Sequence, residues 1–493
     1  MSTFDFDEQF PVLKPACRAL GRISVRLGRI LVLSPIRGVW RRRKPILAVI
    51  AILVVAHSIT TLILGRRVRL QIETLRARGE PVSMADLAGP KIPDSQNGAV
   101  IYAKAFAITS GEKSGKELDD ACDLVSRKKR AENPKIWTEA RAVLAKYGGI
   151  FPIIEKAASM PRCQFPVNWE AGLGATFPHF SKIRTLGRLL SARAILQARD
   201  GDVSGALHSI GLAFKVGESV KDEPSIIGVL VRISVIKVSS SALQDVLRSA
   251  AAESITEAQA RRLYDSLGEI DVAPGFVRAM QGERAFGMSA FDLVRKEGLN
   301  AYPYLLGGDK AHIPQPLNAV LANPMRPILY ADEIFYIDYM NRVVQRAPAL
   351  SRDIYAQEPR GGYEPEFPRY ALVSRIVLPV FTRARKSRDD ATAMIAGSRI
   401  ALALVTHKSR YGAYPASLAD LREKLGWKIE EDAFSGKDFI YKPKGAGFLL
   451  YSIGQNLKDD GARPWLKPGI PEGYEYKNAQ GDHTADIIWE LER

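Results

Sequence analysis

The chain has 493 residues, 46% of them hydrophobic and 25% charged, which is enough for two or three domains with their own cores. Its net charge is +16, but residues 1–80 account for +10 of this excess and the rest of the chain for only +6. A basic excess at one end does not favour nucleic-acid binding, which needs a basic face on the folded domain. Three cysteines are too few for a disulfide framework, and the sequence leaves open whether Cys122 and Cys163 pair.

Residues 1–44 form a basic arm that is expected to lie in the cytoplasm. Within residues 17–33, four arginines share one face of a predicted helix and leucine and isoleucine side chains share the other; the arginines are Arg18, Arg22, Arg26 and Arg29. A basic amphipathic helix of this kind is typical of the membrane interface, where anionic headgroups attract it. The alternative is a flexible basic tail.

Residues 45–64 are a run of twenty mostly apolar residues with basic clusters on both sides, which predicts a transmembrane helix. The run begins too far into the chain for a cleaved signal peptide. The alternative is a buried helix of a soluble domain, because four residues dilute the apolar run: His57, Ser58, Thr60 and Thr61. Ten basic residues precede the run and five follow it closely, so the N-terminus is expected in the cytoplasm. We therefore predict a single-pass protein of the cytoplasmic (inner) membrane, with the bilayer as a partner and residues 65–493 outside the cytoplasm.

The fold class expected beyond the span is mainly α. Residues 65–98 are predicted to form a juxtamembrane tether, and residues 99–384 a helical domain. Its strongest signal is a helical hairpin, in which residues 181–199 and 203–220 flank an Asp-Gly-Asp turn. Thr256 and Gln259 stand at the spacing of a capping box. Residues 300–323 are rich in Pro, Gly and Tyr, and the interpretation as a connector is favoured over a lid or a partner site.

The sequence pattern changes at residue 385, and residues 385–493 are predicted to form a small α+β module. A helical pattern over 389–410 is followed by short apolar runs between glycines, namely Phe439-Ile440-Tyr441 and Phe448-Leu449-Leu450-Tyr451-Ser452-Ile453. Such runs are typical of an antiparallel hairpin. We expect the helix to pack on this small sheet.

The same region resembles the globular domain of the major pseudopilins of type II secretion. The similarity rests on Tyr411-Gly412-Ala413-Tyr414-Pro415 after the helix, Asp432-Ala433-Phe434-Ser435-Gly436-Lys437 before a strand, Leu450-Tyr451-Ser452-Ile453-Gly454 ahead of Lys458-Asp459-Asp460-Gly461, and a closing Asp486-Ile487-Ile488-Trp489. The whole layout also resembles large families of bacterial single-pass membrane proteins that have no assigned function.

The resemblance implies a pseudopilin-like fold and a bound calcium ion in the loop after the hairpin. The acidic residues that would hold calcium are Asp459, Asp460, Asp482 and Asp486, because calcium prefers carboxylate and carbonyl oxygens. The alternative is a solvated acidic turn. A pilus subunit is not expected, because pseudopilins begin with a processed leader and a polymerising helix, and here the nearest apolar run, 371–381, contains Arg375 and Pro379.

No stretch identifies a reaction, and no catalytic or cofactor-binding residue is assigned. The six histidines have no metal-ligand spacing. Glu283 and a run of acids among aromatic residues, Asp332, Glu333 and Asp338, are candidates to line a cleft. The leading hypothesis is a membrane-anchored scaffold that contacts proteins of the cell envelope or the secretion machinery. The alternative is an extracytoplasmic hydrolase with its site in the helical domain.

Overall fold

The computed structural model describes residues 36–125, 135–309, 311–357, 366–378, 381–462 and 487–491. Residue contacts divide the chain into two units, Met1–Arg67 and Val68–Arg493, which are described separately below. The predicted amphipathic helix at 17–33 lies outside the described residues.

The first described helix, α3 (Ile36–Ala77), contains the whole apolar run and the basic residues on both sides of it. Its large apolar side chains are exposed, from Ile46 at 47% to Leu62 at 66%. Three hydroxyls that dilute the run are hydrogen-bonded within the helix, because each donates to the carbonyl oxygen four residues earlier; they belong to Ser58, Thr60 and Thr61. Hydroxyls satisfied in this way are compatible with an apolar environment.

The helix continues past the apolar run and then ends as the sequence predicts. Gly79 follows with a φ of 69°, a left-handed conformation that glycine adopts without the strain of a side chain. A second helix, α11 (Ile226–Arg248), is also long and apolar enough to cross a membrane, but 61% of its most apolar stretch is buried. It packs against α9, α10 and α19, which confirms that it is a core helix.

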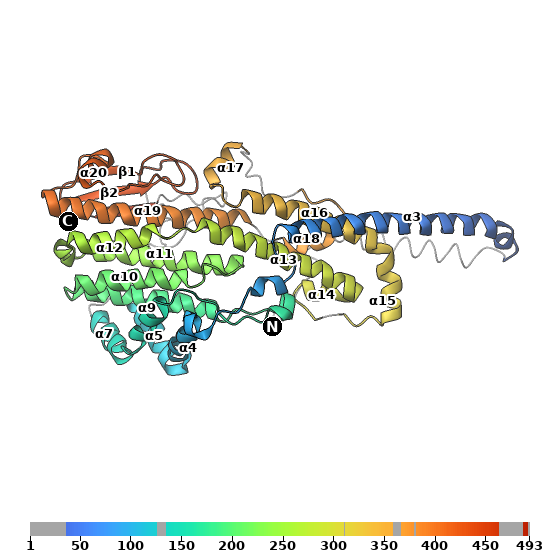
Figure 1. The fold of residues 1–493 in the computed structure, drawn as a ribbon, viewed down its shortest axis with the longest axis horizontal. Helices are drawn as coiled ribbons and strands as arrows, with labels where there is room; N and C mark the ends of the chain where they lie inside the picture. The colour runs from blue at the N-terminus through green and yellow to red at the C-terminus, as the bar shows by residue number, and fades with distance from the viewer. Residues whose placement is uncertain are drawn as a thin grey trace. The chain divides into compact units, whose positions relative to one another are not determined.

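The second unit consists mainly of helices, which begin at the end of α3 and pack in layers (Figure 1). The helices are α4 (Gly98–Ser110), α5 (Glu112–Val125), α7 (Ile136–Lys146), α8 (Ile150–Ala158), α9 (His179–Arg199), α10 (Val203–Glu218), α11, α12 (Glu257–Gly268), α13 (Ala273–Glu297), α14 (Ala301–Leu305), α15 (Gln315–Ala322), α16 (Arg326–Arg346), α17 (Ser351–Gln357), α18 (Leu372–Val377), α19 (Phe381–Tyr411) and α20 (Leu418–Leu425). Short 3₁₀ turns, η1 (Ala85–Ala88), η2 (Asp94–Gln96) and η3 (Trp169–Gly174), form the segments around α4 and α8.

The predicted hairpin is confirmed as α9 and α10, and α11 packs against both. Asp202 caps α10 by accepting a hydrogen bond from the amide of Gly205 at 2.8 Å. Gly187 of α9 allows α11 to approach closely, because a Cβ there would lie 2.7 Å from Val235 Cγ1. The predicted capping box of Thr256 and Gln259 is present at the start of α12.

The structure differs from the sequence-based expectation around residues 300–355. The chain forms two helices here, α16 and α17, which are separated around Pro348, because proline has no amide hydrogen to donate within a helix. The segment 300–323, expected to be a connector, contains α14 and α15. Helices α5 and α8 were not predicted, because the first half of α5 is polar and α8 is short.

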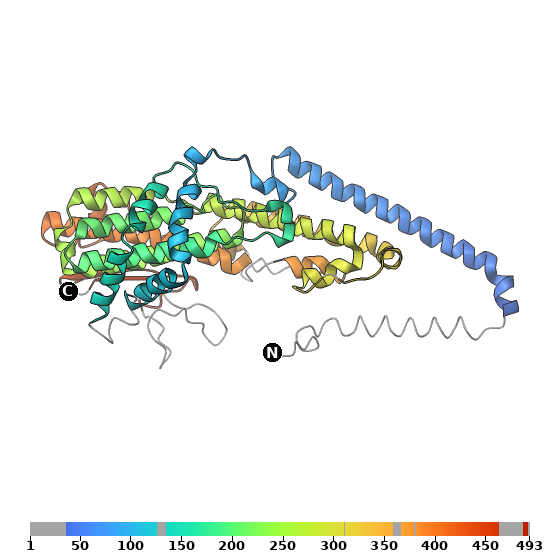
Figure 2. The same ribbon diagram turned by 90° about the horizontal axis from the view of Figure 1, so that it is seen from below.

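Near the C-terminus, three strands form an antiparallel sheet in the order β1 (Ile440–Lys444), β2 (Gly447–Ser452), β3 (Ile487–Leu491). The central strand β2 is fully buried, and α19 lies against β2 and β3. Figure 2 shows the same layers from a second direction. The expectation of a helix packed on a small antiparallel sheet is therefore confirmed.

Candidate functional site: a polar cleft at the start of the helical unit

Three of the acids singled out from the sequence are bound to separate structural partners. Asp332 accepts a hydrogen bond from the amide of Val373 at 2.7 Å and so caps α18. Glu283 accepts from the amide of Ile226 at 2.9 Å, at the start of α11. Asp338 accepts from Gln71 Nε2 at 2.6 Å. These carboxylates hold helices together and do not converge on one cavity.

Burial raises the pKa of Asp332 and of Glu283 above the usual value of a carboxyl, and Glu333, which is fully buried, shows the same effect. Burial raises the pKa of its carboxyl to about 7, although the neighbouring Arg295 guanidinium favours the ionised form. Arg295 donates a hydrogen bond to Glu333 and lines a cavity of about 330 Å³ together with Tyr302 and Arg326. Glu333 itself does not line this cavity, so its proton is not presented to a ligand there.

A larger cleft, of about 730 Å³, lies where the chain enters the second unit. Four segments far apart in the sequence form its walls: the end of α3 with the turn after it, residues 162–165, residues 222–224 before α11, and α13. Trp169 of η3 contributes an aromatic face. The volume of the cleft lies within the range of ligand-binding clefts, about 300–1,000 Å³.

Two amide side chains join the first wall of the cleft to the second. Gln164 accepts a hydrogen bond from the amide of Ile92 at 3.0 Å and donates to the carbonyl oxygen of Ala88 at 2.9 Å. Asn97 Oδ1 accepts from the backbone amide of Gln164 at 2.9 Å, and Asn97 Nδ2 donates to the carbonyl oxygen of Gln164 at 2.9 Å. The segment predicted to be a tether is therefore fixed on the helical unit.

The acidic side chains of the cleft are already bound, whereas two of its arginines are not. Glu80 pairs with Arg284 at 2.5 Å, Asp222 with Arg278, and Glu223 with His179 at 3.3 Å. Within the described residues, the side chains of Arg76 and Arg162 make no hydrogen bond or ion pair, and both are exposed. Arg76 interacts electrostatically with the Asp86 carboxylate, which accepts hydrogen bonds from the amides of Val82 and Ser83. The cleft therefore offers two exposed guanidinium groups without a hydrogen-bond partner, and such groups favour carboxylate or phosphate ligands.

Cys163 also lines the cleft, and its thiol is not paired with Cys122. Burial, with smaller contributions from Glu223 and Asp222, raises the pKa of the Cys163 thiol well above its usual range. A thiol held in its protonated form is a poor nucleophile. The cleft thus lacks an activated cysteine.

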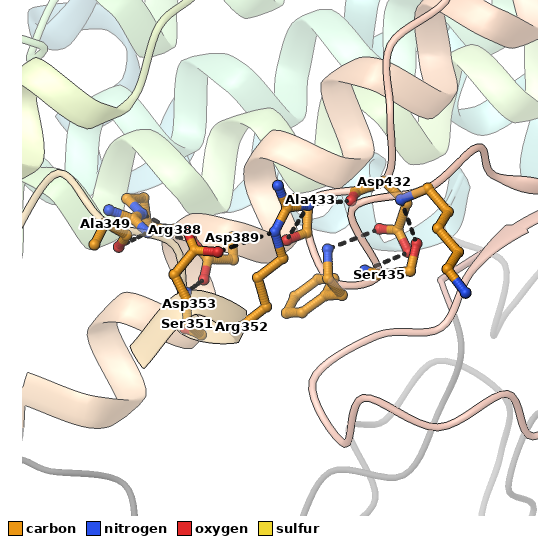
Figure 3. A network of polar contacts seen from close by, with 11 residues as sticks. Ala349, Ser351, Arg352, Asp353, Arg388, Asp389, Asp432, Ala433 and Ser435 are labelled. Carbon is orange, nitrogen blue, oxygen red and sulfur yellow. Dashed lines mark hydrogen bonds and ion pairs between the residues drawn. The ribbon is translucent and has the colours of Figure 1, made fainter. Parts of the chain in front are cut away.

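A second buried polar network connects α17, α19 and the C-terminal module (Figure 3). Arg388 pairs with Asp389 and donates to the carbonyl oxygen of Ala347 at 2.6 Å, while Asp389 accepts from the amide of Ser351 at 2.7 Å. Arg352 donates to the carbonyl oxygen of Asp432 at 3.0 Å. Every charged group in this network has a partner, so we assign it to stability rather than to ligand binding.

The acids proposed for calcium are only partly covered by the structure. Asp459 accepts hydrogen bonds from the Tyr451 hydroxyl at 3.0 Å and the Gly461 amide at 2.9 Å, and Asp460 accepts from Asn456 Nδ2 at 2.7 Å. Asp482 and Asp486 lie outside the described residues. In the described part of the chain, no group of three or more His, Cys, Asp or Glu side chains is placed to hold a metal ion. The calcium site stays a prediction of the resemblance.

Sequence reasoning did not identify the cleft, because its walls come from segments with no common motif. The nearest signal was the irregular stretch 161–178 with its three aromatic residues, Phe165, Trp169 and Phe177. In the structure Phe165 and Trp169 line the cleft. The Phe165 ring stacks on His179 with 4.4 Å between ring centroids, whereas Phe177 meets His179 and Trp169 edge-on. The aromatic residues of this irregular segment thus form a packed part of the cleft wall.

No family model, curated protein or solved structure matches this chain.

Proposed function

We propose that this protein is a membrane-anchored binding protein, whose helical unit lies outside the cytoplasm and binds an acidic segment of a partner protein in the 730 Å³ cleft. The observation that carries the proposal is a pair of exposed guanidinium groups without a hydrogen-bond partner among the described residues, Arg76 and Arg162, in a cleft whose acids are already bound. Such groups bind carboxylates through charge-assisted hydrogen bonds.

The anchor is supported by the exposure of the apolar run in α3. Among the described residues its large apolar side chains are exposed, whereas most of the apolar stretch of α11 is buried. The basic residues on both sides of the run suit lipid headgroups. The orientation, with the N-terminus inside, rests on the short basic arm and the positive-inside rule.

The binding role is supported by the positions of the candidate acidic side chains in the structure. Asp332, Glu283 and Asp338 hold helices, and Glu333 does not line the cavity beside it. A hydrolase needs acids or a nucleophile that reach its substrate. A scaffold needs an accessible surface instead, and the pseudopilin-like C-terminal module suggests partners in secretion or envelope assembly.

The cleft is tested by photocrosslinking in membranes that contain the full chain. A crosslinking amino acid replaces Gln281, which lines the cleft, and in a parallel variant it replaces the exposed Arg184 of α9, outside the cleft. We expect a defined adduct only from position 281, and we expect Arg76→Ala with Arg162→Ala to reduce it about tenfold, as lost charge-assisted bonds do. Arg184→Ala serves as the matched charge control. Equal adducts from both positions, or no effect of the double substitution, would reject this role for the cleft.

The orientation is tested separately with reporters fused to the C-terminus. A reporter that is active only outside the cytoplasm is expected to be active, and one that is active only in the cytoplasm is expected to be silent. The reverse pattern would reject the proposed topology and leave the cleft assignment to its own test.

A further inference from the structure

Helix α15 is packed the opposite way round from a helix of a water-soluble surface. Its polar residue Asn318 is buried, with 2% of its surface exposed, whereas Leu317, Val320 and Leu321 are 52%, 67% and 45% exposed. A surface helix in water normally buries its apolar face and exposes its polar one. The reversal means that this apolar face is made for contact with something other than water.

The reversed orientation is fixed by hydrogen bonds. Asn318 Oδ1 accepts from the amide of Leu299 at 2.9 Å, and Asn318 Nδ2 donates to the carbonyl oxygen of Glu297 at 2.7 Å. Asn300 fixes the loop before α15, because its Oδ1 accepts from the amide of Ile313 at 2.9 Å. These amides satisfy buried backbone groups at the end of α13, so turning α15 over would leave those groups unpaired.

Exposed apolar residues also lie on either side of α15 in the chain, at Leu306 after α14 and at Ile328 in α16; these two, with Leu317, Val320 and Leu321, are called the patch below. The helix α15 itself contains no charged residue. Contiguous exposed apolar surface on a soluble domain marks a contact with a protein or a membrane. Basic and aromatic side chains lie next to the patch, because the 330 Å³ cavity beside α15 is lined by Lys296, Arg326, Tyr302 and Tyr330.

Two polar contacts show which end of the second unit carries the patch. Near the start of its part of α3, Gln71 donates to Asp338 of α16; beyond the end of α3, Glu80 binds Arg284, which donates to Asn341 of α16 at 2.9 Å. The segment 68–80 and α16 therefore run in the same direction. Going back along α16 from Asp338 leads to Ile328, about 15 Å away at 1.5 Å per residue. The patch thus lies toward the end where the chain enters this unit at Val68.

Only residues 65–67 connect the apolar run of α3 to Val68, where this unit begins. The run ends at residue 64, four residues before Val68, so the chain between them spans at most about 14 Å even when fully extended. If the run crosses the bilayer, as proposed above, the surface of the bilayer lies within that distance of Val68. A patch on the same end of the unit is then adjacent to lipid.

We propose that the patch on α14, α15 and the start of α16 inserts into the outer surface of the same bilayer that α3 crosses, as a second, monotopic membrane contact. Leu317, Val320 and Leu321 enter the boundary between headgroups and acyl chains, while Lys296 and Arg326 meet the phosphates of the headgroups. Tyr302 and Tyr330 match the aromatic side chains that proteins place at membrane interfaces. This contact rests on the proposed membrane anchor, and it fixes the orientation of the cleft relative to the membrane.

The test uses the full chain in vesicles of phosphatidylethanolamine and phosphatidylglycerol. Cys17→Ser removes the thiol of the basic arm, while Cys122 and Cys163 stay, because burial raises the pKa of both thiols and makes them slow to label. Val320→Cys, or Glu423→Cys as an exposed control on α20, is labelled with an environment-sensitive fluorophore. The chain without an added cysteine gives the background.

For the label at position 320, we expect blue-shifted emission and at least about twofold stronger quenching by a shallow nitroxide lipid than at position 423, because interfacial helices lie about 5–10 Å into the bilayer. Emission typical of water and quenching by iodide equal to that at position 423 would overturn the proposal. Shielding from both quenchers that grows with the protein-to-lipid ratio would also overturn it, because the patch would then cover a second copy. An alkaline wash of the same vesicles tests the anchor independently: a chain that stays bound while its 320 label is in water rejects only the second contact.

Discussion

The indole of Trp489, on strand β3, lies directly against the backbone of Gly397 in helix α19, in space that any other side chain would occupy. Trp489 is 1% exposed and also meets the ring of Phe439 edge-on, with 6.0 Å between ring centroids. This contact joins the last strand to the long helix of the C-terminal module. Gly397→Ala should therefore destabilise the protein by about 1–3 kcal/mol through overpacking.

The matched control for that substitution is Gly211→Ala in α10, where an added Cβ would lie 3.7 Å from Leu263, an ordinary contact distance. This change should be neutral or stabilise the protein by up to about 1 kcal/mol, because alanine favours helix over glycine. Denaturant midpoints of the two variants, measured in the same detergent, compare the effects directly. Equal midpoints would show that the indole is not held against Gly397.

A second prediction concerns the buried pair in Figure 3. Asp389→Asn leaves the guanidinium of Arg388 buried without its counter-charge, and it weakens the hydrogen bond that Asp389 accepts from the amide of Ser351. Removing one partner of a buried ion pair costs about 3–5 kcal/mol, so the midpoint of unfolding should fall clearly. Asp353→Asn is the control, because the Asp353 side chain is 52% exposed and should contribute less than about 1 kcal/mol. Similar losses in both variants would contradict the assignment.

The pH dependence of the free energy of unfolding should reflect the ionisation of the Glu333 carboxyl. Burial raises the pKa of its carboxyl to about 7 in the folded protein, above the ordinary value of 4.5 expected for the unfolded chain. The folded state therefore binds the proton more tightly, and its stabilising contribution, present in full below pH 4.5, is lost as the pH rises to about 7. Unfolding curves between pH 4 and 8 should show this decline. Glu333→Gln should flatten it, whereas Glu423→Gln should leave it unchanged.

The wall of the cleft depends on Gln164. Gln164→Ala removes the hydrogen bonds to Ile92 and Ala88, so the segment 85–92 should detach more often from the helical unit. Limited proteolysis should then cut this segment several-fold faster, because the open form is more populated, for a cost of about 1–3 kcal/mol. Gln281→Ala, a change in the same cleft, should leave the cleavage rate unchanged. Unchanged cleavage in the Gln164 variant would mean that other contacts hold the segment.

The pseudopilin resemblance predicts a response to calcium. For an affinity of 10⁻⁴–10⁻³ M, 10 mM calcium stabilises the folded chain by about 1.4–2.7 kcal/mol, which raises its melting temperature by a few degrees. Asp459→Asn and Asp482→Asn should each reduce this rise, while Asp438→Asn, at a surface ion pair, should not. If the melting temperature is the same in calcium and in chelator, the chain does not bind calcium at these residues.

The sequence alone determined the features that depend on local pattern. The length of the apolar run, the hairpin turn at residues 200–202, the capping box of Thr256 and the antiparallel runs around Gly447 each follow from residue spacing or from turn and cap chemistry. The short helices α8 and α15 were not predicted, since few residues give a weak periodic signal.

Only the tertiary structure decided which side chains meet. The candidate acids look alike in sequence, but three of them hold helices and Glu333 is buried beside Arg295. The cleft is formed by segments up to two hundred residues apart, and the direction in which α15 faces is set by Asn318 and the end of α13. Contacts between residues far apart in the sequence fix such positions, and these contacts cannot be read from the spacing of residues along the chain.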